Sequence, residues 1–221
     1  MPTQKDFGSK TSMDRGGSFI QLKGKGEKIQ FRLIAPPFYD GKHFQKDGDK
    51  WKVTMCPKIM SESECDSCEE YYKLYREAKN EEDKNKKEEL LKKARYYKAK
   101  VTFYYPILDR SDETAKILKT TLSVRLKIDD RTNMGFDVRK NDWILMRTEK
   151  PGADFYALEP VDSTLSKPLT EKEQEQIKLA QSWNMEEKTG TKLNESSEEF
   201  VKETDVEEVG TENVDPKDIP F

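Results

Sequence analysis

One histidine and three cysteines lie close together in the first third of this 221-residue sequence. Twelve residues separate His43 from Cys56, eight separate Cys56 from Cys65, and two separate Cys65 from Cys68. Two thiolates separated by two residues can face one ion, and a histidine and a cysteine from a preceding hairpin complete a tetrahedron that suits Zn²⁺. Because four protein ligands leave no open position for water, we expect one structural zinc ion without a catalytic role.

Two other interpretations of the cysteines stay open at this point. They are either ordinary buried cysteines beside a surface histidine, or a redox-active Cys-x-x-Cys pair. Against the redox pair, Cys65 follows an acidic loop at 61–64 and not a buried strand. The odd number of cysteines and their clustering favour a reducing compartment and a metal over a disulfide framework, so we expect a cytoplasmic protein.

A basic segment follows the cysteines, and aromatic residues flank it. Residues 84–100 contain eight basic side chains and two acidic ones, a local charge of +6. Basic groups neutralise phosphates while flat rings stack on unpaired bases, and each stacked base contributes about 1–3 kcal/mol. The pattern favours binding of a single-stranded nucleic acid through Tyr71, Tyr75, Lys92, Lys93, Arg95, Tyr96, Lys98, Lys100 and Tyr104.

A strand is predicted over residues 96–108, and its two faces differ in character. The even-numbered residues from Tyr96 to Tyr104 combine lysines with aromatic rings, which favours this face for DNA. The odd-numbered residues from Tyr97 to Tyr105 are apolar or aromatic and are typical of a core. The alternative is that the lysine-rich segment is only a solvated helix face and that the tyrosines pack inside.

The remaining periodicity predicts a mainly β fold with helical insertions. Apolar and polar residues alternate over 28–33, which predicts a half-buried strand, and short apolar runs at 143–146 and 155–158 around Pro151 and Gly152 predict a closing hairpin. Helical spacing over 69–95 predicts a helix or a helical hairpin, and a weaker stripe predicts a short polar helix over 170–185. Residues 115–128 fit one strand or a strand followed by a helix.

Composition sets the domain organisation. Hydrophobic residues make up 33% and charged residues 38% of the chain, which predicts disordered segments beside one core. We expect a flexible arm over 1–17, a core over 18–165 with the metal subdomain at about 40–70, a linker or short helix over 166–193, and a disordered acidic tail over 194–221. That tail carries ten acids and two lysines, so its net charge is −8 and the remainder carries +5 of the total of −3.

Motifs that the sequence lacks, together with its last four residues, indicate which classes of protein to expect. We find no run of 18 apolar residues, signal peptide, Gly-rich phosphate loop or nucleophile constellation, so we expect no membrane partner, no small-molecule substrate and no enzymatic activity. The chain ends in an apolar ring beside a terminal carboxylate, a handle that a partner protein can bind. Its residues are Asp218, Ile219, Pro220 and Phe221.

The stretch from His43 to Cys68, with Trp51 five positions before Cys56 and tyrosines after Cys68, resembles the zinc-containing single-stranded DNA-binding proteins of T-even-like bacteriophages. The resemblance covers about residues 18–165. It implies an OB-fold core, a five-stranded barrel, with an inserted zinc subdomain, and it places Trp51, Tyr96 and Tyr97 near a DNA cleft. The last four residues are similar to the tip of bacterial single-stranded DNA-binding proteins, which docks onto replication and repair proteins.

The function that this resemblance implies is sequence-independent coating of single-stranded DNA during phage replication, recombination and repair, in the cytoplasm of an infected bacterial cell. Two alternatives stay open. One is an RNA-binding module of the same fold, because stacking reads either sugar. The other is a zinc-stabilised scaffold whose basic helix binds protein.

Overall fold

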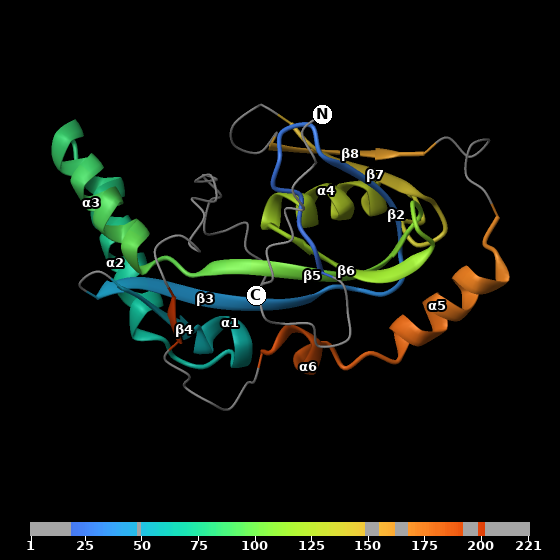
Figure 1. The fold of residues 1–221 in the computed structure, drawn as a ribbon. Coiled ribbons are helices and arrows are strands. Elements are labelled where there is room, and N and C mark those ends of the chain that lie inside the picture. The colour runs from blue at the N-terminus through green and yellow to red at the C-terminus, as the bar shows by residue number, and fades with distance from the viewer. Residues whose placement is uncertain (1–18, 48–49, 149–154, 162–167, 192–198, 202–221) are drawn as a thin grey trace, which may run out of the picture.

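The computed structural model describes residues 19–47, 50–148, 155–161, 168–191 and 199–201 (Figure 1). The predicted flexible arm at 1–17 and the predicted partner-binding tip at 218–221 lie outside these residues. Among the residues that are described, none of the helices combines the length and the apolar character needed to cross a bilayer.

The described strands form one nine-stranded mixed sheet in the order β8-β7-β2-β5-β3-β4-β9, with β6 also on β5 and β1 on β6. The pairing of β1 with β6 is parallel, and all other pairings are antiparallel. The strands are β1 (Phe19–Ile20), β2 (Lys28–Leu33), β3 (Phe38–Asp47), β4 (Lys50–Met55), β5 (Lys100–Asp109), β6 (Thr114–Thr120), β7 (Trp143–Arg147), β8 (Tyr156–Pro160) and β9 (Glu199–Val201). The expectation of a mainly β fold with helical insertions is met.

Helices are inserted at three places in this order of strands. They are α1 (Pro57–Ser61), α2 (Asp66–Asn80) and α3 (Lys84–Tyr97) between β4 and β5, α4 (Leu122–Asn133) between β6 and β7, and α5 (Glu171–Gln181) and α6 (Met185–Thr189) after β8. Figure 1 shows the α2–α3 hairpin at one end of the long strands β3 and β5 and α5 at the other. The predicted helical hairpin is therefore confirmed, and residues 115–128 form a strand followed by a helix.

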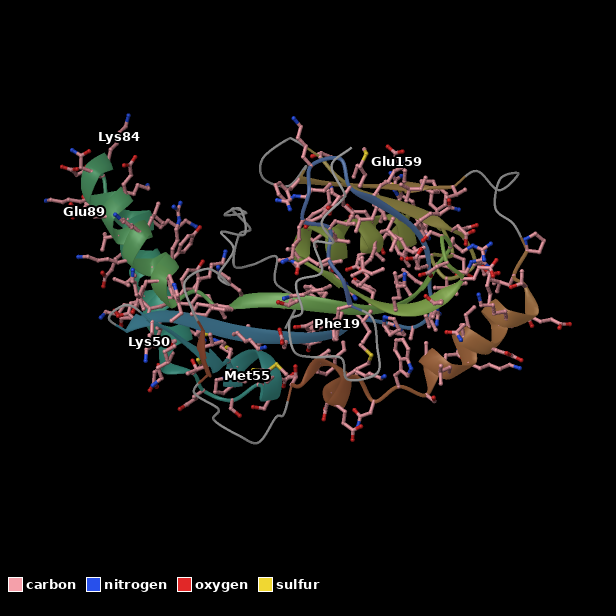
Figure 2. All side chains as sticks on the ribbon, viewed as in Figure 1. Phe19, Lys50, Met55, Lys84, Glu89 and Glu159 are labelled. Carbon is pink, nitrogen blue, oxygen red and sulfur yellow. The ribbon has the colours of Figure 1, made fainter. Side chains whose placement is uncertain are left out.

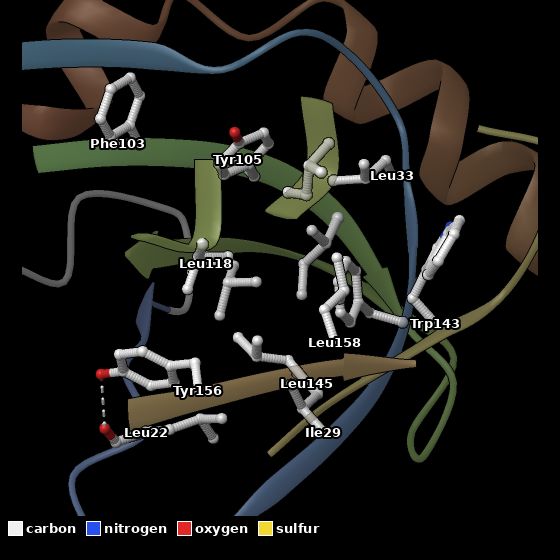
Figure 3. Packing of buried hydrophobic residues seen from close by; sticks show 14 residues of the cluster. Leu22, Ile29, Leu33, Phe103, Tyr105, Leu118, Trp143, Leu145, Tyr156 and Leu158 are labelled. Carbon is white, nitrogen blue, oxygen red and sulfur yellow. Dashed lines mark hydrogen bonds between the residues drawn. The ribbon is translucent and has the colours of Figure 1, made fainter. Parts of the chain in front are cut away.

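The main core lies between β2, β5, β6, β7, β8 and α4 (Figure 3). Phe31, Tyr105, Leu118, Val124 and Trp143 are at most 1% exposed. Full burial of one large apolar side chain stabilises the fold by about 1.5–3 kcal/mol. The strand predicted at 28–33 and the closing hairpin, now β7 and β8, are confirmed, because their alternate residues fill this core.

The strand predicted to begin at Tyr96 begins only at Lys100, because α3 continues through Tyr97. The assignment of Tyr96 and Lys98 to one strand face is therefore wrong. Aromatic residues favour strands only weakly, and tertiary contacts override that preference here. Ala94 is buried in the α2–α3 hairpin, and the carbonyl of Tyr97 is held by His43.

The C-terminal part of the chain is anchored to the sheet at three points. Glu173 of α5 binds Arg110, whose guanidinium also binds Asp142 at 3.1 Å. The Thr191 hydroxyl, after α6, donates to Asp40 of β3 at 3.4 Å. Within the segment predicted to be disordered, β9 pairs with the edge of β4, whose backbone groups offer a partner that composition does not reveal.

Candidate metal centre and nucleic-acid interface

The four predicted metal ligands come together from three different elements. His43 lies in β3, Cys56 directly follows β4, Cys65 precedes α2, and Cys68 lies in the first turn of α2. All four side chains are buried, and their ligand atoms lie within 4.8 Å of one another, so they could hold one metal ion. His43 is only 1% exposed, which rules out the alternative of a surface histidine beside unrelated cysteines.

The distances between the donor atoms fit a tetrahedral ion. Cys56 Sγ lies 3.4 Å from Cys68 Sγ and 3.9 Å from Cys65 Sγ. His43 Nε2 lies 3.2 Å from Cys65 Sγ and 3.7 Å from Cys68 Sγ. With zinc bonds of about 2.3 Å to sulfur and 2.0–2.1 Å to nitrogen, a tetrahedron has edges of about 3.8 Å between sulfurs and about 3.5 Å between sulfur and nitrogen. These four of the six edges lie within about 0.4 Å of the tetrahedral values, and the remaining two are no longer than 4.8 Å.

The close packing of α1 on β3 helps to position the candidate metal centre. A Cβ atom on Gly41 would lie 2.6 Å from the Ile59 side chain, so only glycine allows α1 to pack this tightly on β3. The Cys56 amide donates to the Gly41 carbonyl at 2.8 Å, and Pro57 begins α1. Proline suits this first position because its fixed φ matches a helix. An N–H group at this position would have no acceptor within the helix, so its absence costs nothing.

The imidazole of His43 is oriented by a second contact. Its Nδ1 lies 2.9 Å from the carbonyl oxygen of Tyr97, at the end of α3. A carbonyl oxygen can only accept, so Nδ1 carries the proton and Nε2 presents its lone pair to the cysteines. Metal-binding histidines are commonly fixed in this way, and here the contact also joins the centre to α3.

The three cysteine thiols differ in how readily each one loses its proton. A hydrogen bond from Cys68 lowers the pKa of the Cys56 thiol to about 4. The same hydrogen bond and burial raise the pKa of Cys68, and burial raises that of Cys65. Only one of the three thiols is therefore readily ionised, whereas a bound cation favours the thiolate form of every ligand.

The residues predicted to bind DNA are spread over several environments. Tyr71 is buried and Tyr75 half-buried within the α2–α3 hairpin, where their ring centroids lie 5.9 Å apart. Lys92, Lys93 and Arg95 are exposed on α3, whose far end is marked by Lys84 in Figure 2. Lys98 and Tyr97 are half-buried where α3 meets β5.

Tyr104 does not offer an accessible ring, contrary to the prediction from strand parity. It is only 6% exposed, and its hydroxyl donates to Asp40 at 3.1 Å. Burial, together with the charge of Asp40, raises the pKa of Tyr104 far above its usual range. The opposite face of β5 forms the core as predicted, with Phe103 and Tyr105 in the main cluster.

Three of the predicted residues do meet on one surface, together with two that the sequence did not single out. Lys46 lies opposite Trp51 and Lys42 opposite Lys100 in the strand register, and directly opposed residues share a sheet face. Phe44 lies between Lys42 and Lys46 on that face, and the Lys100 ammonium lies 5.1 Å from the centroid of its ring. The Tyr96 hydroxyl donates to the Lys46 carbonyl at 2.7 Å. We name this set the aromatic-lysine surface: Phe44, Lys46, Trp51, Tyr96 and Lys100.

The sequence contains only part of the signal for this surface. The alternation of residues 38–47 places Phe44 and Lys46 on one face of a strand, but only the register with β4 and β5 brings them to Trp51 and Lys100. Within the surface, Tyr96 is 39% exposed, and Lys46 and Lys100 are exposed. Phe44 and Trp51 are half-buried. One exposed ring, two half-buried rings and two exposed lysines therefore lie close to the candidate metal centre, because β3 carries both Phe44 and His43.

No protein-family model matches the chain, and no curated protein matches it.

Proposed function

We propose that this chain is a sequence-independent single-stranded DNA-binding protein with an OB-fold core and one structural zinc ion. The observation that supports it best is the aromatic-lysine surface, which gathers rings and cations from α3, β3, β4 and β5 beside the metal centre. Rings that stack on bases and lysines that bind phosphates are the two components of single-strand binding, and neither distinguishes one base from another.

In this proposal zinc has a structural role. His43, Cys56, Cys65 and Cys68 would hold the ion, which supplies a crosslink between β3, the end of β4 and α2. The hydrogen bond from His43 to the Tyr97 carbonyl would also fix the end of α3 to this crosslink. Tyr96 would then stay in place, with its hydroxyl on the Lys46 carbonyl. The closed set of four ligands and the mix of sulfur and nitrogen donors fit zinc better than hard cations such as Mg²⁺ or Ca²⁺.

The biological role we propose is to coat and protect single strands during replication, recombination and repair of phage DNA in an infected bacterial cell. Residues 218–221 would recruit other proteins of these processes. This part of the proposal rests on the resemblance of the sequence and on the chemistry of the chain end.

The deciding experiment is a salt titration of binding to fluorescent oligo-dT and to duplex DNA of equal length, with zinc quantified on the same preparation. We expect a strong preference for the single strand, one zinc per chain, and a log–log salt slope of about −0.7 per neutralised phosphate. Tyr96→Ala and Lys100→Ala should each weaken binding, whereas Lys140→Ala, an exposed lysine after α4, should not.

Other outcomes of this titration would favour one of the two alternative functions. Equal affinity for duplex and single strand would refute the proposal and favour the protein-binding scaffold. Preference for a matched RNA oligonucleotide in competition would favour the RNA-binding module. Quenching of Trp51 fluorescence by oligo-dT, absent in Trp51→Phe, is the expected spectroscopic signature of stacking on this surface.

A further inference from the structure

We infer that the bound strand continues from the aromatic-lysine surface across β5 and β6 to a second contact site, formed by Phe19 of β1 and Lys119 of β6. This inference rests on the proposed function and adds the direction of the strand and two contact residues. The ligand is the same single-stranded DNA, with a base on the Phe19 ring and a phosphate at Lys119.

The strand register places both residues on the same face as Lys100. Alternate residues share a face, so Lys100, Tyr104 and Pro106 of β5 point the same way. Lys119 lies directly opposite Tyr104, and Ile117 lies opposite Pro106. Phe19 is in turn the partner of Ile117 in the parallel pairing of β1 with β6. In Figure 2, Phe19 lies beside the middle of the long strands.

The Phe19 ring is both supported and accessible. It meets the Tyr104 ring edge to face at a centroid distance of 6.3 Å, and Tyr104 in turn lies 6.3 Å from Phe38. Phe19 nevertheless remains 38% exposed, and Lys119 is exposed beside it. An exposed ring that is held by buried rings loses little conformational entropy when a base stacks on it.

Asp40 lies beside the route between the two sites. Its buried carboxylate contacts Lys42 at 3.1 Å and is covered by Thr191. Asp40 lies directly opposite Thr102 in the strand register, so a strand that runs from Lys100 to Lys119 passes beside this carboxylate, whose charge is offset by Lys42. Lys100 and Tyr104 are four positions apart in β5, a step of about 13 Å at about 3.3 Å per residue.

The chain supplies a matched control on the other face of the sheet. Tyr39 is more exposed than Phe19, at 47%, and it also packs against a buried ring, that of Phe103, at a centroid distance of 5.9 Å. It follows Phe38 in β3 but points to the opposite face. Phe19→Leu and Tyr39→Leu therefore remove equivalent rings while keeping apolar contacts to the core.

The test measures oligo-dT affinity of the full chain at two lengths, about 4 and about 16 nucleotides, the limits for one OB fold. We expect Phe19→Leu to weaken binding of the longer oligonucleotide about 5- to 150-fold, the equivalent of one lost stacking contact, and to leave its salt slope unchanged. Lys119→Ala should make that slope shallower by about 0.7. Tyr39→Leu and Lys140→Ala should change neither quantity, and melting temperatures of all variants should stay close to that of the parent chain.

Two results would overturn the inference, and both differ from a failure of the proposed function. Loss of affinity in Tyr39→Leu with none in Phe19→Leu would place the strand on the opposite face. No effect in Phe19→Leu and Lys119→Ala, while Tyr96→Ala and Lys100→Ala still weaken binding, would end the strand at the aromatic-lysine surface. If none of the four variants weakens binding, the proposed function itself fails.

Discussion

At the scale of single residues, the metal centre brings together three cysteines whose thiolate forms would repel one another. Three thiols and one imidazole lie within 4.8 Å in a buried site. Taking several thiolates out of water is costly unless a cation compensates their charge. A metal ion held by these residues would therefore stabilise the packed form of the cluster, because its binding free energy would add to the folding free energy.

Replacing one ligand tests this view. We expect Cys68→Ser to abolish zinc binding and to lower the free energy of unfolding by several kcal/mol, as for other structural zinc sites. Zinc content by metal analysis and chemical denaturation would measure both effects. The control is Ser67→Ala, one residue away, which removes only a 3.1 Å hydrogen bond from Gln45; full zinc content in Cys68→Ser would show that Cys68 is not a ligand.

Single residues were predictable where their chemistry is rare and local. The chain has one histidine and three cysteines, so few alternative ligand sets exist, and the structure brings these four together. Lysines and tyrosines are abundant, and their type does not reveal whether they are buried. Tyr71 and Tyr104 are buried, and Phe44 became a candidate only through its neighbours across the sheet.

At the scale of elements, the tight packing of α1 on β3 determines where Cys56 lies. Gly41→Ala should destabilise the protein by about 1–3 kcal/mol through overpacking and weaken its zinc affinity, because the new Cβ meets Ile59. A double variant, Gly41→Ala with Ile59→Ala, relieves the collision and should recover much of the zinc affinity. Chelator competition measures both, and no recovery in the double variant would contradict a steric cause.

The anchoring of α5 predicts a dependence on pH. Burial alone would raise the pKa of Glu173, but the backbone hydrogen bond from Thr170 and the charge of Arg110 outweigh it, so the pKa is lowered. Because the pKa is lower in the folded state, the ionised carboxylate stabilises the folded protein at pH values above the unfolded pKa of about 4.3. This stabilisation is lost as the pH falls through the pKa of the folded state. Glu173→Gln should cost about 1.5–3 kcal/mol at pH 7.

The measurement is the free energy of unfolding of both proteins from pH 7 to pH 3. Their difference should shrink as the pH falls, because the parent chain loses the ionised carboxylate that the variant never had. Glu175→Gln, on an exposed position of the same helix, serves as the control. A difference that stays constant down to pH 3 would show that the charge of Glu173 is not responsible.

Elements were predictable where one periodicity dominates. The strand at 28–33 and the hairpin of β7 with β8 show clear alternation, and the spacing over 69–95 indicated helices. The boundary at 96–100 was not predictable, because it depends on the contact of Tyr97 with His43, 54 positions earlier. Aromatic residues at a helix end carry no local sign of such a contact.

At the scale of the whole molecule, the separation of charge between body and tail has a measurable effect. The tail carries −8 and the remainder +5, so under the proposed function the tail would compete with DNA for basic side chains. Deleting residues 194–221 should tighten binding to oligo-dT by at least about fivefold at low salt, and the gain should fade as salt rises.

A second truncation separates this competition from the pairing of β9. Removing residues 202–221 leaves β9 on β4 but takes away seven of the ten acids. Fluorescence titration of both truncations against the parent chain should show that most of the gain is already present in the shorter deletion. Unchanged or weaker affinity in both would contradict competition by the tail.

The overall topology could be anticipated only as a class. Composition and periodicity indicated a mainly β molecule with inserted helices. The parallel pairing of β1 with β6 and the long reach of β5, which pairs with β2, β3 and β6, follow from packing between residues far apart in the chain. Local propensity contains no information about such partners.

The hydrogen bond from His43 to the Tyr97 carbonyl has a thermodynamic consequence. Under the proposed function, it would couple metal binding at the centre to the placement of Tyr96. Linkage is reciprocal, so whatever factor zinc adds to the affinity for a DNA strand, the strand must add to the affinity for zinc. A chelator would then remove zinc first from protein molecules without bound DNA, while DNA-bound molecules would retain it.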